Sequence, residues 1–118
     1  MSMKHLRATV IIVAGGKGVR MGGALPKQYM ALDGRPVLWH TLQSFEATEC
    51  ISSIILVVAA DDIAYCQQVV LGGGVFLKVR SLVIGGSDRA HSVRAGLEET
   101  IDEDALILVH DAVRPFVS

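Results

Sequence analysis

The chain has 118 residues, a formal net charge of −1 and 51% apolar side chains. This length fits one domain with a sizeable core, and the high apolar fraction excludes intrinsic disorder. The near-neutral charge argues against nucleic-acid binding, and no apolar run approaches the roughly 20 residues that span a bilayer.

The N-terminus and the cysteines predict a cytoplasmic protein without a membrane partner. The chain starts with a basic, then apolar stretch that ends in glycines and Lys17, with no small-residue cleavage site. A first strand is therefore favoured over a signal peptide. Cys50 and Cys66 are isolated and lack CxxC spacing, which is typical of thiols in a reducing compartment.

The first half of the chain predicts a strand, a loop and a helix. Ala8–Ala14 is a continuous, largely β-branched run that is typical of a strand buried on both faces. Gly15–Lys27 is a glycine-rich loop. From about Val37 to Ala47, apolar side chains at i, i+4 and i+7 predict an amphipathic helix: Leu38, Leu42 and Phe45.

The second half repeats the alternation. Ser53–Ala60 predicts a second buried strand, and Asp61 or Asp62 would cap a helix that ends at three glycines, Gly72 to Gly74. Strand material lies within Val75–Ile84. Ser87 or Asp88 would cap the next helix, with Val93 and Leu97 facing inward. Ala105–Val109 predicts a third strongly buried strand.

This order of elements predicts an α/β fold with a Rossmann-like parallel sheet. A doubly wound sheet normally continues past a strand such as Ala105–Val109, so we expect the sheet to be incomplete at the C-terminus. In open parallel sheets, ligands bind beyond the carboxyl ends of the strands. Three loops leave such ends: Gly15–Lys27, Gly85–Ser92 and His110–Pro115.

The first loop predicts a polyphosphate site. Its glycines let backbone N–H groups approach an anion, and Lys17, Arg20 and Lys27 add positive charge. It is not a dinucleotide fingerprint, because Met21 stands where the third glycine should be. It is not a Walker loop either, because Gly18 follows Lys17. The alternative is a surface loop with solvated lysines.

The second and third loops each allow two interpretations. The glycine pair Gly85-Gly86 could contact a base edge together with Ser92, or Asp88 could simply cap the helix while Arg89 forms a structural salt bridge. Asp111 could hold Mg²⁺, which takes one or two carboxylates plus substrate phosphates. Capping of the next turn is the simpler explanation for Asp111 taken alone.

Other side chains indicate no second chemistry. Arg114 could pair with Asp111 or steady its loop, and Trp39 is expected in the core. The four histidines have no metal-ligand spacing, and no nucleophile is placed with a base. They are His5, His40, His91 and His110.

Taken together, the three loops resemble a known family. The segments are AGGKGVRMG with PKQY, GGSDRAHSVRAGL and VHDAVRPF, and the match runs from about Val10 to Phe116. They resemble the 2-C-methyl-D-erythritol 4-phosphate cytidylyltransferases of the non-mevalonate isoprenoid pathway. The resemblance implies that residues 1–118 are the N-terminal portion of a single nucleotidyltransferase domain, about half of the family's length.

The resemblance also implies an activity and a site. The family transfers CMP from CTP to 2-C-methyl-D-erythritol 4-phosphate and releases pyrophosphate, with Mg²⁺ as cofactor. Arg20 and Lys27 match its catalytic basic pair, and Asp111 matches a Mg²⁺ ligand. Gly86 and Ser92 match cytosine-contacting positions. The remaining expected nucleotide-binding residues are Ala14, Gly15, Gly16, Lys17 and Gly18 in the first loop, and Ala112 against the ribose.

Some positions depart from the family's pattern. Val13 replaces a frequent Pro, Gly15 a frequent Ala, and Ser87 a frequently acidic residue. The family's second metal-ligating Asp, its acceptor contacts, a later Lys and the arm that forms its homodimer are expected beyond Ser118. Two alternatives stay open: a cytidylyltransferase for a pentitol phosphate such as ribitol 5-phosphate, and an inactive nucleotide-binding fragment.

Overall fold

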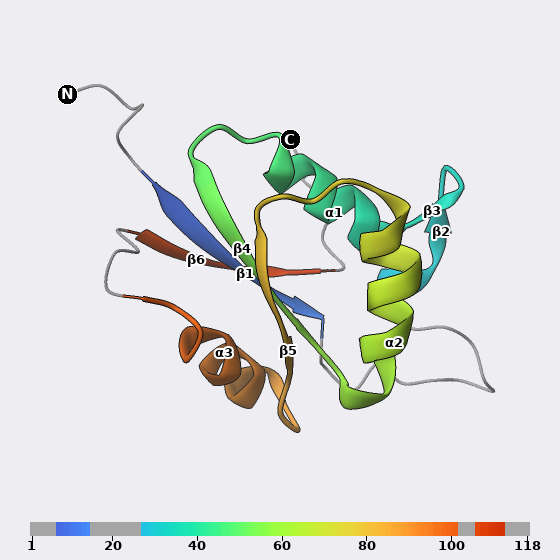
Figure 1. Ribbon diagram of the computed structural model, residues 1–118. Helices are drawn as coiled ribbons and strands as arrows, with labels where there is room; N and C mark the ends of the chain where they lie inside the picture. The colour runs from blue at the N-terminus through green and yellow to red at the C-terminus, as the bar shows by residue number, and fades with distance from the viewer. Residues whose placement is uncertain (1–6, 15–26, 102–105, 113–118) are drawn as a thin grey trace.

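A computed structural model describes residues 7–14, 27–101 and 106–112 (Figure 1). Four parallel strands form one sheet in the order β5-β4-β1-β6. Their bounds are β1 Ala8–Ala14, β4 Ile51–Val58, β5 Val79–Ile84 and β6 Leu106–Asp111. A two-stranded antiparallel hairpin, β2 Ala31–Leu32 with β3 Arg35–Pro36, lies outside this sheet. The α/β class with a parallel sheet is confirmed.

The strand order reverses direction beside β1. From β1 the chain moves outward to β4 and then to β5, and it returns to the opposite side of β1 with β6. The crossover that follows β1 carries α1, Val37–Glu46, and the one that precedes β6 carries α3, Arg89–Leu97, and these two helices lie on opposite faces of the sheet. The boundary between β1 and β6 is the switch point at which open α/β sheets bind ligands, outside the carboxyl ends of the strands.

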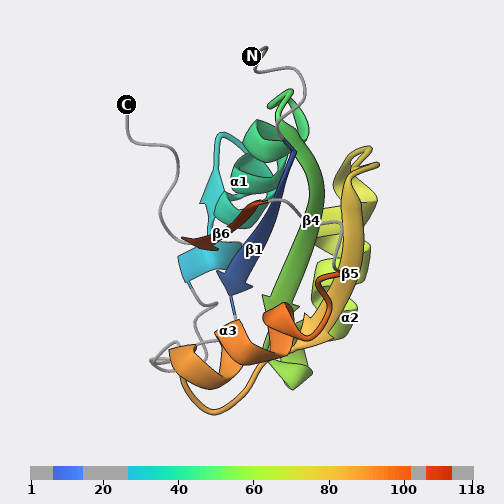
Figure 2. The ribbon, with the colours of Figure 1, turned by 90° about the vertical axis from the view of Figure 1, so that its left-hand side faces the viewer.

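Helices cover both faces of the sheet (Figure 2). One face carries α1 and a helical stretch over residues 60–73, whereas α3 lies on the other. Side chains alternate along β1 because successive residues of a strand point to opposite faces. Val10 and Ile12 accordingly pack in the large cluster with α1, and Ile11 and Val13 in a small cluster on the α3 side.

The helical stretch over residues 60–73 differs from the single capped helix predicted there. It runs without a break from a 3₁₀ turn, η3, through α2 and the π-helical η4 to a second 3₁₀ turn, η5. Neither predicted aspartate caps it by a side-chain hydrogen bond, because η3 already begins at Ala60. The bounds are η3 Ala60–Asp62, α2 Ile63–Tyr65, η4 Cys66–Val70 and η5 Leu71–Gly73.

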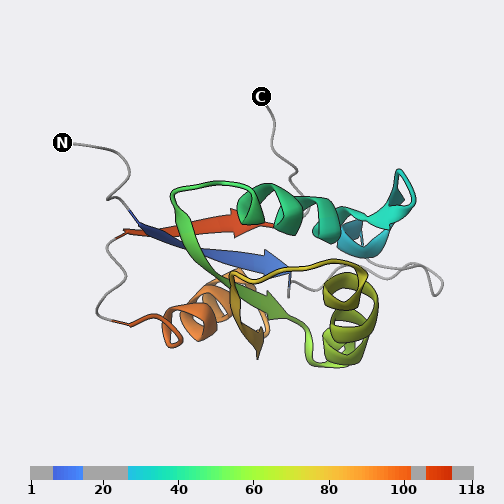
Figure 3. The same cartoon turned by 45° about the horizontal axis from the view of Figure 1, so that its top comes forward.

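Two burial predictions were wrong. The last strand was predicted to be strongly buried, yet Leu106 to Val109 are 36–52% exposed, because β6 lies at the edge of the described sheet (Figure 3). Leu97 was predicted to face inward but is 43% exposed. The helix α3 buries Ser92 and Gly96 instead, and these small residues bring it close to the sheet.

The close approach of α3 to the sheet can be tested at Gly96. A Cβ there would lie 2.5 Å from Cγ2 of Ile11 and 3.2 Å from Cγ2 of Val57. We predict that Gly96→Ala lowers the free energy of unfolding by about 1–3 kcal/mol through overpacking, even though Ala is the better helix former. Urea unfolding measures this, with exposed Arg94→Ala as the control in the same helix; an unchanged or raised stability would contradict the packing.

Candidate active site

Three of the predicted site residues meet at the switch point. Ala14 ends β1, Asp111 ends β6, and Ala112 follows directly. The parallel register pairs Val13 with Asp111. The carboxyl ends of the two strands therefore place the first and third loops next to each other, as the sequence predicted.

The backbone of Ala112 is held from two elements. Its N–H donates to the Val13 carbonyl at 3.0 Å, and its own carbonyl accepts from Oγ1 of Thr41 in α1 at 3.3 Å. The residue is buried. These two hydrogen bonds fix the backbone of Ala112 beside Asp111. Thr41, which donates one of them, was not among the predicted site residues.

Gln28 and Tyr29 anchor the short turn that follows the first loop. The short 3₁₀ turn η2, Lys27–Tyr29, holds both side chains in the interior. Nε2 of Gln28 donates to the Ala14 carbonyl at 2.9 Å, and the Tyr29 hydroxyl lies 3.3 Å from Sγ of Cys66. The backbone of Lys27 is therefore attached to the end of β1. In the PKQY segment only Lys27 was predicted to be functional, and the anchoring roles of Gln28 and Tyr29 were not predicted.

The Tyr29–Cys66 contact is a neutral one. Burial raises the pKa of the Cys66 thiol to about 11, and the hydrogen bond with Tyr29 opposes that rise only in part. Burial likewise raises the pKa of the Tyr29 hydroxyl, and its hydrogen bond to Cys66 raises that pKa further. Both groups stay protonated near neutral pH, so this pair anchors η2 and supplies no nucleophile.

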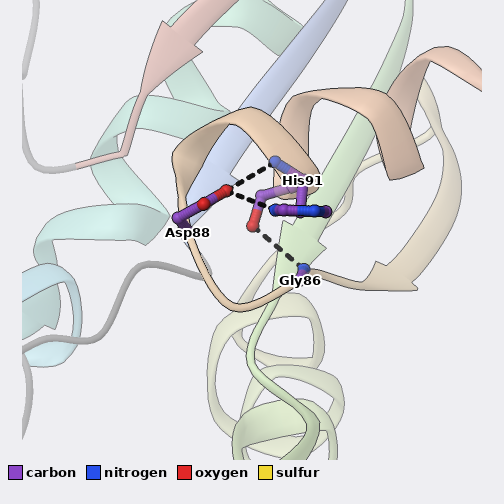
Figure 4. Close-up of polar contacts among 4 residues, drawn as sticks. Gly86, Asp88 and His91 are labelled. Carbon is purple, nitrogen blue, oxygen red and sulfur yellow. Dashed lines mark hydrogen bonds and ion pairs between the residues drawn. The ribbon is translucent and has the colours of Figure 1, made fainter.

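The second loop is shaped by close packing against α3 (Figure 4). The Gly85 N–H donates to the Val58 carbonyl at 2.7 Å, and the Gly86 N–H donates to Oγ of Ser92 at 3.2 Å. A Cβ on Gly85 would lie 2.6 Å from that Oγ, and one on Gly86 2.2 Å from Cβ of His91. The packing alone thus requires both glycines, and the fully buried Ser92 holds Gly86 in place.

Asp88 caps α3, so one of its two alternative interpretations is confirmed. Its Oδ1 accepts from the backbone N–H of His91 at 2.8 Å and lies 2.7 Å from Nδ1 of the same residue (Figure 4). The backbone hydrogen bond, followed by the side-chain one, lowers the pKa of the Asp88 carboxyl. The first turn of α3 is thereby fixed above the ends of the strands.

An ion pair connects the second loop with the third. Nε of Arg89, the first residue of α3, lies 3.0 Å from Oδ1 of Asp111, and the two side chains are 59% and 31% exposed. The predicted salt bridge of Arg89 is confirmed, and its partner is the expected metal ligand. The suggested pairing of Arg114 with Asp111 lies outside the described residues.

Asp111 is the carboxylate that the sequence is expected to offer to Mg²⁺. In the part of the chain that the structure describes, no group of three or more His, Cys, Asp or Glu side chains could hold a metal. A single, partly exposed carboxylate with one oxygen engaged by Arg89 fits Mg²⁺, since that ion completes its shell with substrate phosphates and water.

The rest of the first loop lies outside the described residues. This concerns the predicted phosphate ligands and one of the two predicted catalytic cations: Gly15, Gly16, Lys17, Gly18 and Arg20. Of Lys27 the structure describes the backbone, in η2. The described part of the candidate site therefore consists of Ala14, Gly86, Ser92, Asp111 and Ala112, together with the residues that contact them.

Comparison with known proteins identifies the family. The family model of 2-C-methyl-D-erythritol 4-phosphate cytidylyltransferase matches residues 8–118. The chain belongs to this family. A cytidylyltransferase of this name from Alkaliphilus metalliredigens is 47% identical over 112 residues, which are 95% of this chain and 46% of the relative. One from Clostridium botulinum is 46% identical over 110 residues, 93% of this chain and 48% of the relative.

Solved structures agree with the family assignment. The 4-diphosphocytidyl-2C-methyl-D-erythritol synthase of Anaerococcus prevotii superposes with a TM-score of 0.77 at 34% identity, covering 96% of this chain and 46% of that protein. The Francisella tularensis cytidylyltransferase gives a TM-score of 0.63 at 26% identity, covering 94% and 46%. The chain thus spans about half the length of the relatives it matches. Within the described residues, no helix is both long and apolar enough to cross a membrane.

The cap of α3 predicts a pH dependence of stability. Because the folded protein lowers the pKa of Asp88, the stabilisation is complete above the carboxyl's ordinary value of about 3.9 and is lost as the pH falls through the lowered value. We predict that Asp88→Ala is less stable than the wild type at pH 7, and that the difference shrinks below about pH 4. Urea unfolding from pH 7 to pH 3 measures it; a difference that stays constant would contradict the assignment.

The Gln28 anchor makes a second stability prediction. Removing the amide leaves the Ala14 carbonyl without this buried donor, so Gln28→Ala should lower the free energy of unfolding by about 1–3 kcal/mol. Gln68→Ala, at an exposed position of η4, serves as the matched control and should change stability by less than about 0.5 kcal/mol. Equal effects of the two substitutions would show that the Gln28 hydrogen bond contributes nothing.

Proposed function

We propose that this chain forms the CTP-binding part of a cytidylyltransferase that transfers CMP to 2-C-methyl-D-erythritol 4-phosphate and releases pyrophosphate. The observation that carries the proposal is family membership over residues 8–118. Its physical support is the switch point, where Ala14, Asp111 and Ala112 are held together at the ligand-binding edge of the sheet.

The proposed reaction is an in-line displacement at the α-phosphorus of CTP. A phosphate oxygen of the acceptor forms the new bond to this phosphorus, the bond to the bridging oxygen breaks, and pyrophosphate leaves with the electron pair. Both reactants are anions, so the protein must offset their repulsion and stabilise the charge on the crowded phosphorus. Arg20 and Lys27 are the proposed cations for this task.

The other residues would bind the nucleotide. Gly15, Gly16, Lys17 and Gly18 would surround the phosphates after Ala14, and Ala112 would lie against the ribose. The Gly86 loop, fixed by Ser92, would contact the cytosine. Asp111 would hold Mg²⁺, which supplies Lewis-acid stabilisation of phosphate charge when bound. The acceptor, the cytoplasmic location and a homodimer of the complete protein belong to the same proposal.

Substitution of the two cations tests the proposed chemistry. In the complete protein, we predict that Arg20→Ala and Lys27→Ala each lower the rate of pyrophosphate release by about 100- to 1,000-fold, because a donor aimed at the developing charge is worth on the order of 3–4 kcal/mol. Release is followed with CTP, Mg²⁺ and the acceptor, and the melting temperature should stay unchanged. Arg94→Ala is the charge-matched control. Near-normal turnover of either variant would refute its assignment.

The same assay separates the alternative activities. Turnover with ribitol 5-phosphate but not with methylerythritol phosphate would indicate the pentitol-phosphate enzyme. Calorimetric binding of CTP with Mg²⁺, but no turnover with either acceptor, would indicate that this chain binds the nucleotide without catalysing transfer. Absence of CTP binding would overturn the proposal.

A further inference from the structure

The ion pair between Arg89 and Asp111 connects two motifs that are 22 positions apart in the sequence. We propose that Arg89 is a positioning residue for Asp111: its Nε–H holds Oδ1, so that Oδ2 faces the divalent cation that accompanies the CTP phosphates. This inference rests on the proposed function, because it concerns the same nucleotide site. It adds a residue whose task is to orient the metal ligand.

Asp111 needs such an orienting contact because of where it lies. It ends an edge strand whose side chains are largely exposed, and its register partner Val13 packs on the α3 side of the sheet. The carboxylate consequently points toward α3, and about a third of its side chain stays exposed. A carboxylate at such an edge can rotate, so a hydrogen bond from a fixed donor defines which oxygen is presented.

Arg89 is well placed to be that donor. Asp88 caps the helix that Arg89 begins, and the Gly86–Ser92 hydrogen bond ties the preceding loop to the same turn. Oδ1 of Asp88, the neighbouring carboxylate on this turn, is engaged by His91. The turn that carries Arg89 is therefore fixed by contacts of its neighbours, and the Arg89 side chain extends across to the end of β6.

The chemistry of the contact distinguishes orientation from competition. If Arg89 simply neutralised Asp111, it would compete with a cation, and its removal would tighten metal binding. If the Nε–H orients the carboxylate, its removal should weaken metal binding. Because the donor is Nε and not a terminal nitrogen, Arg89→Gln places an amide nitrogen at the same distance along the side chain, whereas Arg89→Met places a methyl group there.

The experiment measures how strongly a metal enhances CTP binding. The affinity for CTP is determined by calorimetry in EDTA and again with Mn²⁺ as the probe, and the ratio of the two dissociation constants is the metal enhancement. A merely structural defect changes both affinities together and leaves this ratio unchanged. Asp111→Asn is the reference without the carboxylate, and Arg94→Ala is the control for loss of positive charge on the same helix.

We expect Arg89→Met to reduce the metal enhancement by about tenfold, as loss of an outer-shell partner commonly does. Arg89→Gln should retain most of it, and Arg94→Ala all of it. Three outcomes would show that the Nε–H does not orient Asp111: both Arg89 variants match the wild type, both bind the metal more tightly, or both lose the enhancement equally. Any of these would overturn this inference and leave the proposed function standing. If Asp111→Asn itself retains the full enhancement, or if CTP does not bind, both the proposed nucleotide site and this inference are wrong.

Discussion

The parallel pairing of β6 with β1 is the constraint on which the site depends. β6 could have extended the sheet beyond β5, but it returns to the far side of β1 and pairs Asp111 with Val13. This placement brings Asp111, at the end of β6, next to the end of β1, where the first loop begins. The Ala112 N–H bond to Val13 and the Thr41 bond to Ala112 extend the pairing past the strand. The register therefore determines which residues at the ends of β1 and β6 lie side by side at the candidate site.

The sequence predicted the parts of the fold that depend on local pattern. The β-branched run of β1 and the apolar spacing of α1 each indicate the type of element from neighbouring residues alone. Both elements occur within a residue or two of the predicted bounds. Exposure of β6 could not be predicted this way. An apolar strand at a sheet edge has the same composition as a buried one, and only the strand order distinguishes them.

The site divides in the same manner. Glycine and charge at three predicted strand ends indicated one candidate site, and the structure brings described residues of the three segments together there. An N-cap aspartate was one of two stated possibilities for Asp88. The contacts of Arg89 with Asp111 and of Gln28 with Ala14 are long-range and depend on topology. Leu97 was wrongly predicted to face inward, because the buried face of α3 was predicted from its larger apolar side chains. The helix in fact turns its small residues, Ser92 and Gly96, toward the sheet.

The charges at the switch point follow a consistent physical logic. A lone carboxylate at the edge proposed to receive a triphosphate would repel it, and the ion pair with Arg89 would offset this repulsion while no metal is bound. Because both side chains remain partly exposed, their attraction is screened and weak enough for the carboxylate to accept a second cation. The partial exposure of the Arg89–Asp111 pair is thus compatible with the proposed site, at which a metal would arrive and leave with its nucleotide.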